Sequence, residues 1–396
     1  MTSPADPDPI DVVAFGVGSF FFEIPSATVP TIEVRNPKGV ISGEEFSRRV
    51  RNALESIPSL EDVQVSEASS LVLYYHEPWK ASPAWQPHDH GPHPSGPLIP
   101  HFADLTISFK AHIPYRVQST FMGVAETEDF LVDIQCQDGF PVVFIHGEGL
   151  GIDQRPSASI VVVREFLRSE FRQRKEQMDG VIFCDLGPTP FHAECYVLSD
   201  EASSSEFRFD WKHSASRYST LLMYYPPNDY STADEAYQEI KHQIAVDLSE
   251  YYSFTNLANI QRDKWSYIDF QLSELARTYY SPGLVAAFRR GFLNGRTARR
   301  LSLEVLEAEA DVGSMMRAAE AVTQQLEGGD HLPAFRDAYV KRVEGSSAAA
   351  PGRVREIVAF FDTMHSRTMN TVTVVVSSLL GGIVGAAITA LASRGK

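Results

Sequence analysis

The sequence predicts an α+β or α/β N-terminal domain, an α-helical domain after it and a single C-terminal transmembrane helix. Short apolar runs rich in Val, Ile, Phe and Tyr, broken by Gly, Pro and Asp, continue to about residue 230. Apolar residues then recur with helical spacing, and the last part holds an uncharged stretch. We therefore expect three parts: residues 1–230, 231–350 and 351–396.

Composition limits the partners. The chain has 396 residues and a formal net charge of −16, so it lacks the general attraction to phosphates that nucleic-acid binding requires. Its three cysteines have no paired spacing, which argues against a disulfide framework or a cysteine-rich zinc site and fits a reducing compartment. Residues 1–10 do not resemble a secretory signal. We expect no nucleic-acid partner and a bulk of the chain in the cytoplasm.

The first part is expected to contain strands and two helices. A capping box of Ser42 and Glu45 predicts a helix over 44–57, and a second helix is expected over 160–177. Between them, residues 78–101 form a Pro- and His-rich loop that cannot belong to a central strand. Examples of the expected strands are 12–24, 71–75, 105–109, 130–134, 142–146, 181–184 and 195–198.

Histidines crowd in the loop 78–101. His88, His90 and His93 are close enough in sequence to chelate a metal ion such as zinc, although no fixed zinc spacing is present. The alternative is a solvated loop.

The second part should be helical. Thr232 and Glu235 form a capping box at the start of one helix, and Pro282-Gly283 end a second one. A third helix, 298–327, carries a heptad seam. We favour an intramolecular antiparallel pair for this seam over a coiled coil between chains. Its members are Leu301, Val305, Ala308, Val312, Met315, Ala319, Val322 and Leu326.

The last part predicts a stalk helix continuing into a membrane anchor. Residues 371–392 give 22 positions without an ionisable side chain, against about 20 needed to cross a bilayer. Small residues recur at every fourth position in two adjacent rows, which favours close packing between membrane helices. These positions include Ser377, Gly381, Gly385 and Thr389 in one row and Gly382 and Ala386 in the other. We expect a lipid membrane and further copies of the chain as partners.

Two glycine-rich segments and one His/Cys pair remain. Residues 15–19 favour a bend in a strand, and residues 147–151 follow a strand as a phosphate-binding loop does, but no Gly-Lys-Ser/Thr follows. If helix 160–177 crosses over to a neighbouring parallel strand, His146 and Cys184 both lie at carboxyl ends of strands. This arrangement resembles that of caspase-like peptidases, and the resemblance implies a catalytic dyad.

The order of parts also resembles that of CorA-like divalent-cation transporters. The segment Arg367-Thr368-Met369-Asn370 is similar to that family's membrane entry, but it has no Gly before Met369 and no second span follows. We expect a membrane-tethered sensor, scaffold or membrane-perturbing effector rather than an enzyme. A CorA-like channel component and a membrane-anchored cysteine hydrolase are the alternatives. The sequence names no cofactor.

Overall fold

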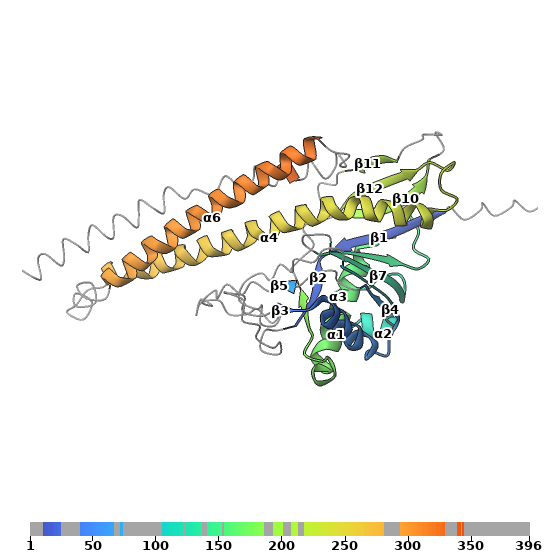
Figure 1. Ribbon diagram of the computed structural model, residues 1–396, viewed down its shortest axis with the longest axis horizontal. Coiled ribbons are helices and arrows are strands. Elements are labelled where there is room, and N and C mark those ends of the chain that lie inside the picture. Colours follow the sequence, from blue (N-terminus) through green and yellow to red (C-terminus); the bar gives the residue numbers. More distant parts are fainter. Residues whose placement is uncertain are drawn as a thin grey trace, which may run out of the picture. The chain divides into compact units, whose positions relative to one another are not determined.

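The computed structural model describes residues 11–24, 40–66, 72–73, 105–121, 123–136, 141–152, 154–185, 193–200, 207–212, 218–280, 294–328, 339–341 and 343 (Figure 1). These residues belong to two compact units. The first comprises the chain up to Asn256 together with 322–341, and the second comprises 257–321 and 342–396. The helix α4 (Ala233–Tyr280) contributes residues to both units.

The first unit is built on an eight-stranded mixed sheet, and its fold is α+β. Its strands lie in the order β11 (Arg208–Lys212), β12 (Ser219–Tyr225), β10 (Ala193–Ser199), β1 (Val12–Gly18), β8 (Val142–Gly147), β7 (Asp129–Cys136), β6 (Leu105–His112) and β4 (Leu60–Val65). β10 and β12 are parallel, and the other neighbours are antiparallel.

Two shorter strand pairs accompany this sheet. β2 (Phe20–Glu23) follows β1 after a break at Ser19 and pairs with β9 (Ile182–Asp185), and β3 (Val40–Ile41) pairs with β5 (Val72–Leu73). The break at Ser19 agrees with the bend predicted from residues 15–19.

One face of the sheet packs against α1 (Gly43–Glu55) and α3 (Ser157–Gln173), two of the helices drawn with the sheet in Figure 1. Strand residues alternate between the faces, so Val132 and Ile134 of β7 join this core, where they meet Phe46 and Leu167. The short α2 (Tyr115–Gln118) and the 3₁₀ turn Lys175–Gln177 complete the helical segments of this region.

The opposite face packs against the first half of α4. The Tyr237 ring lies 4.9 Å from the Phe15 ring of β1, centroid to centroid, and the buried Lys241 ammonium bonds the Asp133 carboxylate of β7. The change from strands to helices thus comes near residue 231 as expected, but the compact unit continues to Asn256.

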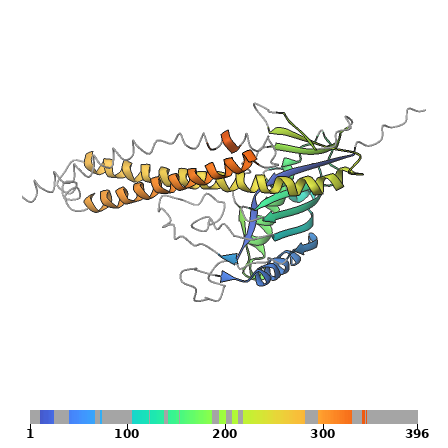
Figure 2. The same ribbon diagram turned by 45° about the horizontal axis from the view of Figure 1, so that its top comes forward.

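The second unit contains a pair of long helices, the second half of α4 and α6 (Asn294–Gly328), which are seen side by side in Figure 2. Ile268 and Leu272 of α4 share an apolar cluster with Leu301, Val305 and Ala308 of α6. The prediction of an intramolecular helix pair is therefore confirmed for this part of the seam.

None of the helices in the described ranges is long and apolar enough to cross a bilayer. The predicted anchor, residues 371–392, lies outside the described residues.

Candidate functional site

His146 lies at the end of β8, on the face that packs against α4. Its Nδ1–H donates a hydrogen bond of 3.0 Å to the carbonyl oxygen of Ala14, and its ring lies 6.2 Å from the Tyr237 ring. These contacts hold the imidazole between strand and helix, as packing contacts do.

Cys184 lies in β9, where its thiol donates a hydrogen bond of 3.2 Å to the carboxylate of Glu23. Burial raises the pKa of the Cys184 thiol well above its usual value, and the charge of Glu23 raises it further. Burial likewise raises the pKa of Glu23, which is 4% exposed. A nucleophilic cysteine needs a lowered pKa, so this environment works against thiolate chemistry.

The structure does not bring His146 and Cys184 together. Their strands were expected to be parallel neighbours, but β8 lies between β1 and β7, and β9 pairs with β2 in a separate sheet. His146 is opposite Phe15 and Cys184 is opposite Phe21. The two positions are thus separated by roughly 20 Å along the β1–β2 segment, at about 3.3 Å per residue. The expectation of neighbouring parallel strands was wrong, and the dyad that depended on it is not assembled.

The glycine segment after β8 is also closed to a phosphate. Gly149 takes a positive φ of 74°, and α3 begins after Pro156. However, the Glu194 carboxylate accepts hydrogen bonds from Ser157 at this helix end, 2.8 Å from its backbone N–H and 2.6 Å from its hydroxyl. A carboxylate from the same chain thus occupies the position that an anionic ligand requires.

The other predicted site residues lie outside the described residues. They are His88, His90 and His93 of the metal proposal, and Ser377, Gly381, Gly382, Gly385, Ala386 and Thr389 of the membrane association. Within the described part of the chain, no three His, Cys, Asp or Glu side chains are placed to hold a metal ion.

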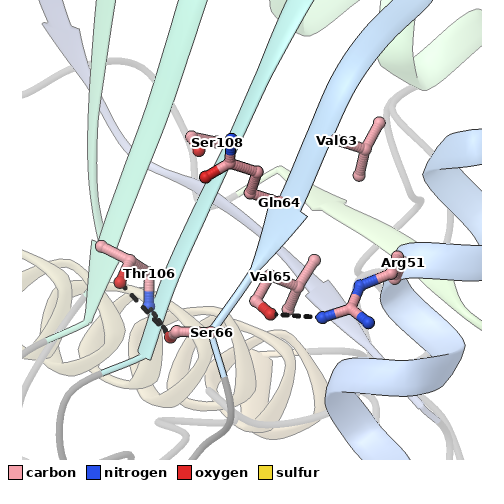
Figure 3. Close-up of a pocket in the computed structure, with 7 residues that line it drawn as sticks. All are labelled: Arg51, Val63, Gln64, Val65, Ser66, Thr106 and Ser108. Carbon is pink, nitrogen blue, oxygen red and sulfur yellow. Dashed lines mark hydrogen bonds between the residues drawn. The ribbon is translucent and has the colours of Figure 1, made fainter.

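A polar pocket of about 470 Å³ lies at the β4 end of the sheet (Figure 3). Its lining consists of Arg51, Val63, Gln64, Val65, Ser66, Thr106 and Ser108. We call this set the β4 pocket.

Hydrogen bonds fix one end of the β4 pocket. The Thr106 N–H donates to Ser66 Oγ at 2.8 Å, and the Ser66 N–H donates to the Thr106 carbonyl at 2.9 Å. Arg51 reaches from α1 and donates through Nη2 to the Val65 carbonyl at 2.7 Å, as the dashed line in Figure 3 marks. The guanidinium thus covers a strand-edge carbonyl and places a positive charge at the pocket.

Polar residues continue across the sheet from the β4 pocket. Gln64 is opposite Ser108, and Ser108 is opposite Asp133, while Thr106 is opposite Gln135. Directly opposite residues point to the same face, so these side chains form a polar strip over β4, β6 and β7. Gln135 is 2% exposed, and among the described residues neither atom of its amide has a hydrogen-bond partner.

The lining of the β4 pocket carries hydrogen-bonding groups. Hydroxyl and amide groups can both donate and accept hydrogen bonds, and the guanidinium can donate them. The pocket was not predicted from the sequence, because β4 was not predicted. The alternation of Thr106, Ser108 and Lys110 with apolar residues in β6 does, however, indicate a polar face.

Comparison of the chain with protein-family models, with curated proteins and with solved structures found no match. Its function is therefore inferred from its own residues.

Proposed function

We propose that this protein is a membrane-tethered sensor or scaffold. Residues 371–392 anchor the chain in a lipid bilayer, the sheet-containing unit binds a small polar ligand in the β4 pocket, and the anchor helices associate. The observation that carries the proposal is the run of 22 residues without an ionisable side chain. Such a run is long enough to cross about 30 Å of hydrocarbon as a helix.

The described residues support a binding role for the sheet-containing unit. His146 and Cys184 lie apart, and the thiol is held in its protonated form by burial and by Glu23. The β4 pocket offers hydrogen-bonding groups and one guanidinium. These features favour recognition over catalysis.

The anchor is tested by flotation of the full-length protein with lipid vesicles. We expect the full chain to float and a chain that stops after Asn370 to remain in the soluble fraction. A finer comparison uses two single variants, Ile383→Arg and Ser393→Arg, in the same assay. A charge near the middle of the span opposes insertion by about 2.5 to 3.5 kcal/mol, whereas one at its end reaches the interface. Full-length protein that stays soluble without detergent or lipid would contradict the anchor.

Association of the anchor helices is tested by the mass of the assembly in detergent. Gly381→Leu combined with Gly385→Leu places large side chains in the small-residue row and pushes the helices apart without lowering hydrophobicity. A smaller assembly is therefore expected. Gly382→Leu tests the adjacent row, and Ile383→Leu serves as the control. An unchanged mass in both glycine variants would mean that the rows face lipid.

A CorA-like channel component is the second candidate. It is favoured by the presence of an α+β sheet unit followed in sequence by two long helices, which is the order of parts on which that resemblance rests. A ring-sized assembly that conducts divalent cations in vesicles would support the channel, and a dimer without conductance would support the scaffold.

A further inference from the structure

The helix α6 carries two apolar stripes on different faces. The first, with Leu301, Val305 and Ala308, is buried against α4. The second consists of Leu303, Leu306, Ala310 and Gly313, spaced by three, four and three residues, and we call it the outer stripe. Leu303 is 67% exposed and Leu306 is 48% exposed. Alternating steps of three and four are the spacing by which one helix packs against another.

Gly313 supplies an independent observation. Among the side chains that the structure describes, a Cβ atom built there would meet only the Arg317 Nη1 atom, at 3.7 Å. The packing of this chain around Gly313 therefore does not demand a glycine, although glycine weakens a helix interior. A glycine on an outward helix face does allow the backbone of a second helix to approach closely.

The charges of α6 identify the partner. Residues 296, 299 and 300 are arginines, and the acidic residues 304, 307, 309 and 311 follow. An antiparallel second copy of α6 would place the basic segment beside the acidic one twice. A parallel copy would place like charges side by side, which is unfavourable.

We propose that the outer stripe of α6 docks on α6 of a second copy of this chain, antiparallel, with Leu303 facing Leu306 of the second copy and Gly313 facing position 296. Two leucines per chain give a contact well below the roughly 1,200 Å² that stable complexes bury. Docking therefore needs the high local concentration of copies on one membrane, and in this respect it rests on the proposed function.

The test is oxidative crosslinking of the full-length protein in lipid vesicles. Leu303→Cys protein and Leu306→Cys protein, carrying different tags, are reconstituted together. The antiparallel arrangement predicts a disulfide between a Leu303→Cys chain and a Leu306→Cys chain. This mixed disulfide should form several-fold more efficiently than a disulfide between two chains that carry the same tag. Both leucines are exposed, so neither exchange touches the buried cluster with α4.

Arg317→Cys is the matched control, since it is an exposed position in line with the same stripe. In the antiparallel arrangement it faces position 292, before α6 begins, and should not crosslink. Wild-type protein controls for the native cysteines, of which Cys136 and Cys195 are buried. Absence of the mixed disulfide, or an equally strong Arg317→Cys disulfide, would overturn the proposal. Flotation of the same samples reports the anchor separately, so failure of docking and failure of tethering are distinguishable.

Discussion

At the scale of the residue, two buried glutamines of the first unit have opposite environments. The Gln118 amide donates to the carbonyls of Ile113 and Thr127, and it accepts from the Ala125 N–H. The Gln135 amide makes no hydrogen bond with the part of the chain that the structure describes, and its exposure of 2% is nearly as low as the 0% of Gln118. A buried amide without partners has lost its hydration and gained nothing in return.

This contrast predicts opposite effects of the same substitution. Gln135→Leu should raise the free energy of unfolding by about 1 kcal/mol, because an unpaired amide is replaced by an apolar group of similar size. Gln118→Leu should lower it by on the order of 3 kcal/mol, because three backbone groups lose their partner. Urea denaturation of the two variants measures both changes in the free energy of unfolding. Equal losses in the two variants would mean that Gln135 is hydrogen-bonded in solution.

Cys184 gives a second prediction at this scale. Because burial and Glu23 raise its pKa, its thiolate fraction at pH 8 is small, and we expect alkylation at least about tenfold slower than that of a free thiol. Glu23→Gln removes the charge and should speed the reaction. His146→Ala should leave the rate unchanged, because the two residues do not meet. Site-resolved mass spectrometry follows the reaction, and a rate that falls in His146→Ala would restore the dyad.

At the scale of the element, apolar pattern predicted the strands that are buried. Residues 142–146 and 130–134 coincide with β8 and β7 because both strands lie inside the sheet. β4 was not predicted, because it ends the sheet, carries the sequence LEDVQV and has a register shift between Glu61 and Gln64. Such strands are specified by their partner more than by their own residues.

Helix ends were predictable where their chemistry is local. The Ser42 side chain accepts from the Glu45 N–H at 3.2 Å, as the capping box indicated. The pair of helices expected after residue 231 is one helix of 48 residues, in which neither Gly nor Pro occurs. The order of strands was not predictable in this way, because β1 enters between β8 and β10 from a distant part of the sequence. His146 and Cys184 are separated because β9 pairs with β2 in a separate two-stranded sheet and is not a neighbour of β8.

Two glycines in regular elements should respond differently to alanine. Gly313→Ala should stabilise α6 by about 1 kcal/mol, because its Cβ would make an ordinary contact of 3.7 Å with the flexible Arg317 side chain and glycine disfavours a helix interior. Gly16→Ala should destabilise the first unit by on the order of 2 kcal/mol, because its Cβ would lie 2.7 Å from the Pro156 carbonyl oxygen. Denaturant unfolding of both variants is the measurement. A destabilised Gly313→Ala protein would show that the glycine is needed within one chain.

At the scale of the whole molecule, the charge and the two units limit how it works. A net charge of −16 disfavours attraction to anionic surfaces, so the proposed tether depends on apolar burial by residues 371–392. The β4 pocket belongs to the first unit and the outer stripe belongs to the second. Ligand recognition and docking are therefore assigned to separate parts of one chain.

Both long helices run from one unit into the other, α4 after Asn256 and α6 before Val322. The length and the rotation of one helix must therefore match those of the other. Each residue advances an α-helix by about 100°, so an insertion of seven turns it by nearly two full turns and restores its faces. Seven residues added to α4 alone should lower the thermal midpoint of unfolding, since α4 would then be seven residues too long for its partner α6. Seven added to both helices at these points should restore the midpoint, as circular dichroism would report. Equal tolerance of single and paired insertions would contradict this coupling. If the paired insertion is accepted, the length of the helix pair can change in steps of seven residues while the residues at both of its ends keep their orientation around the helix axes.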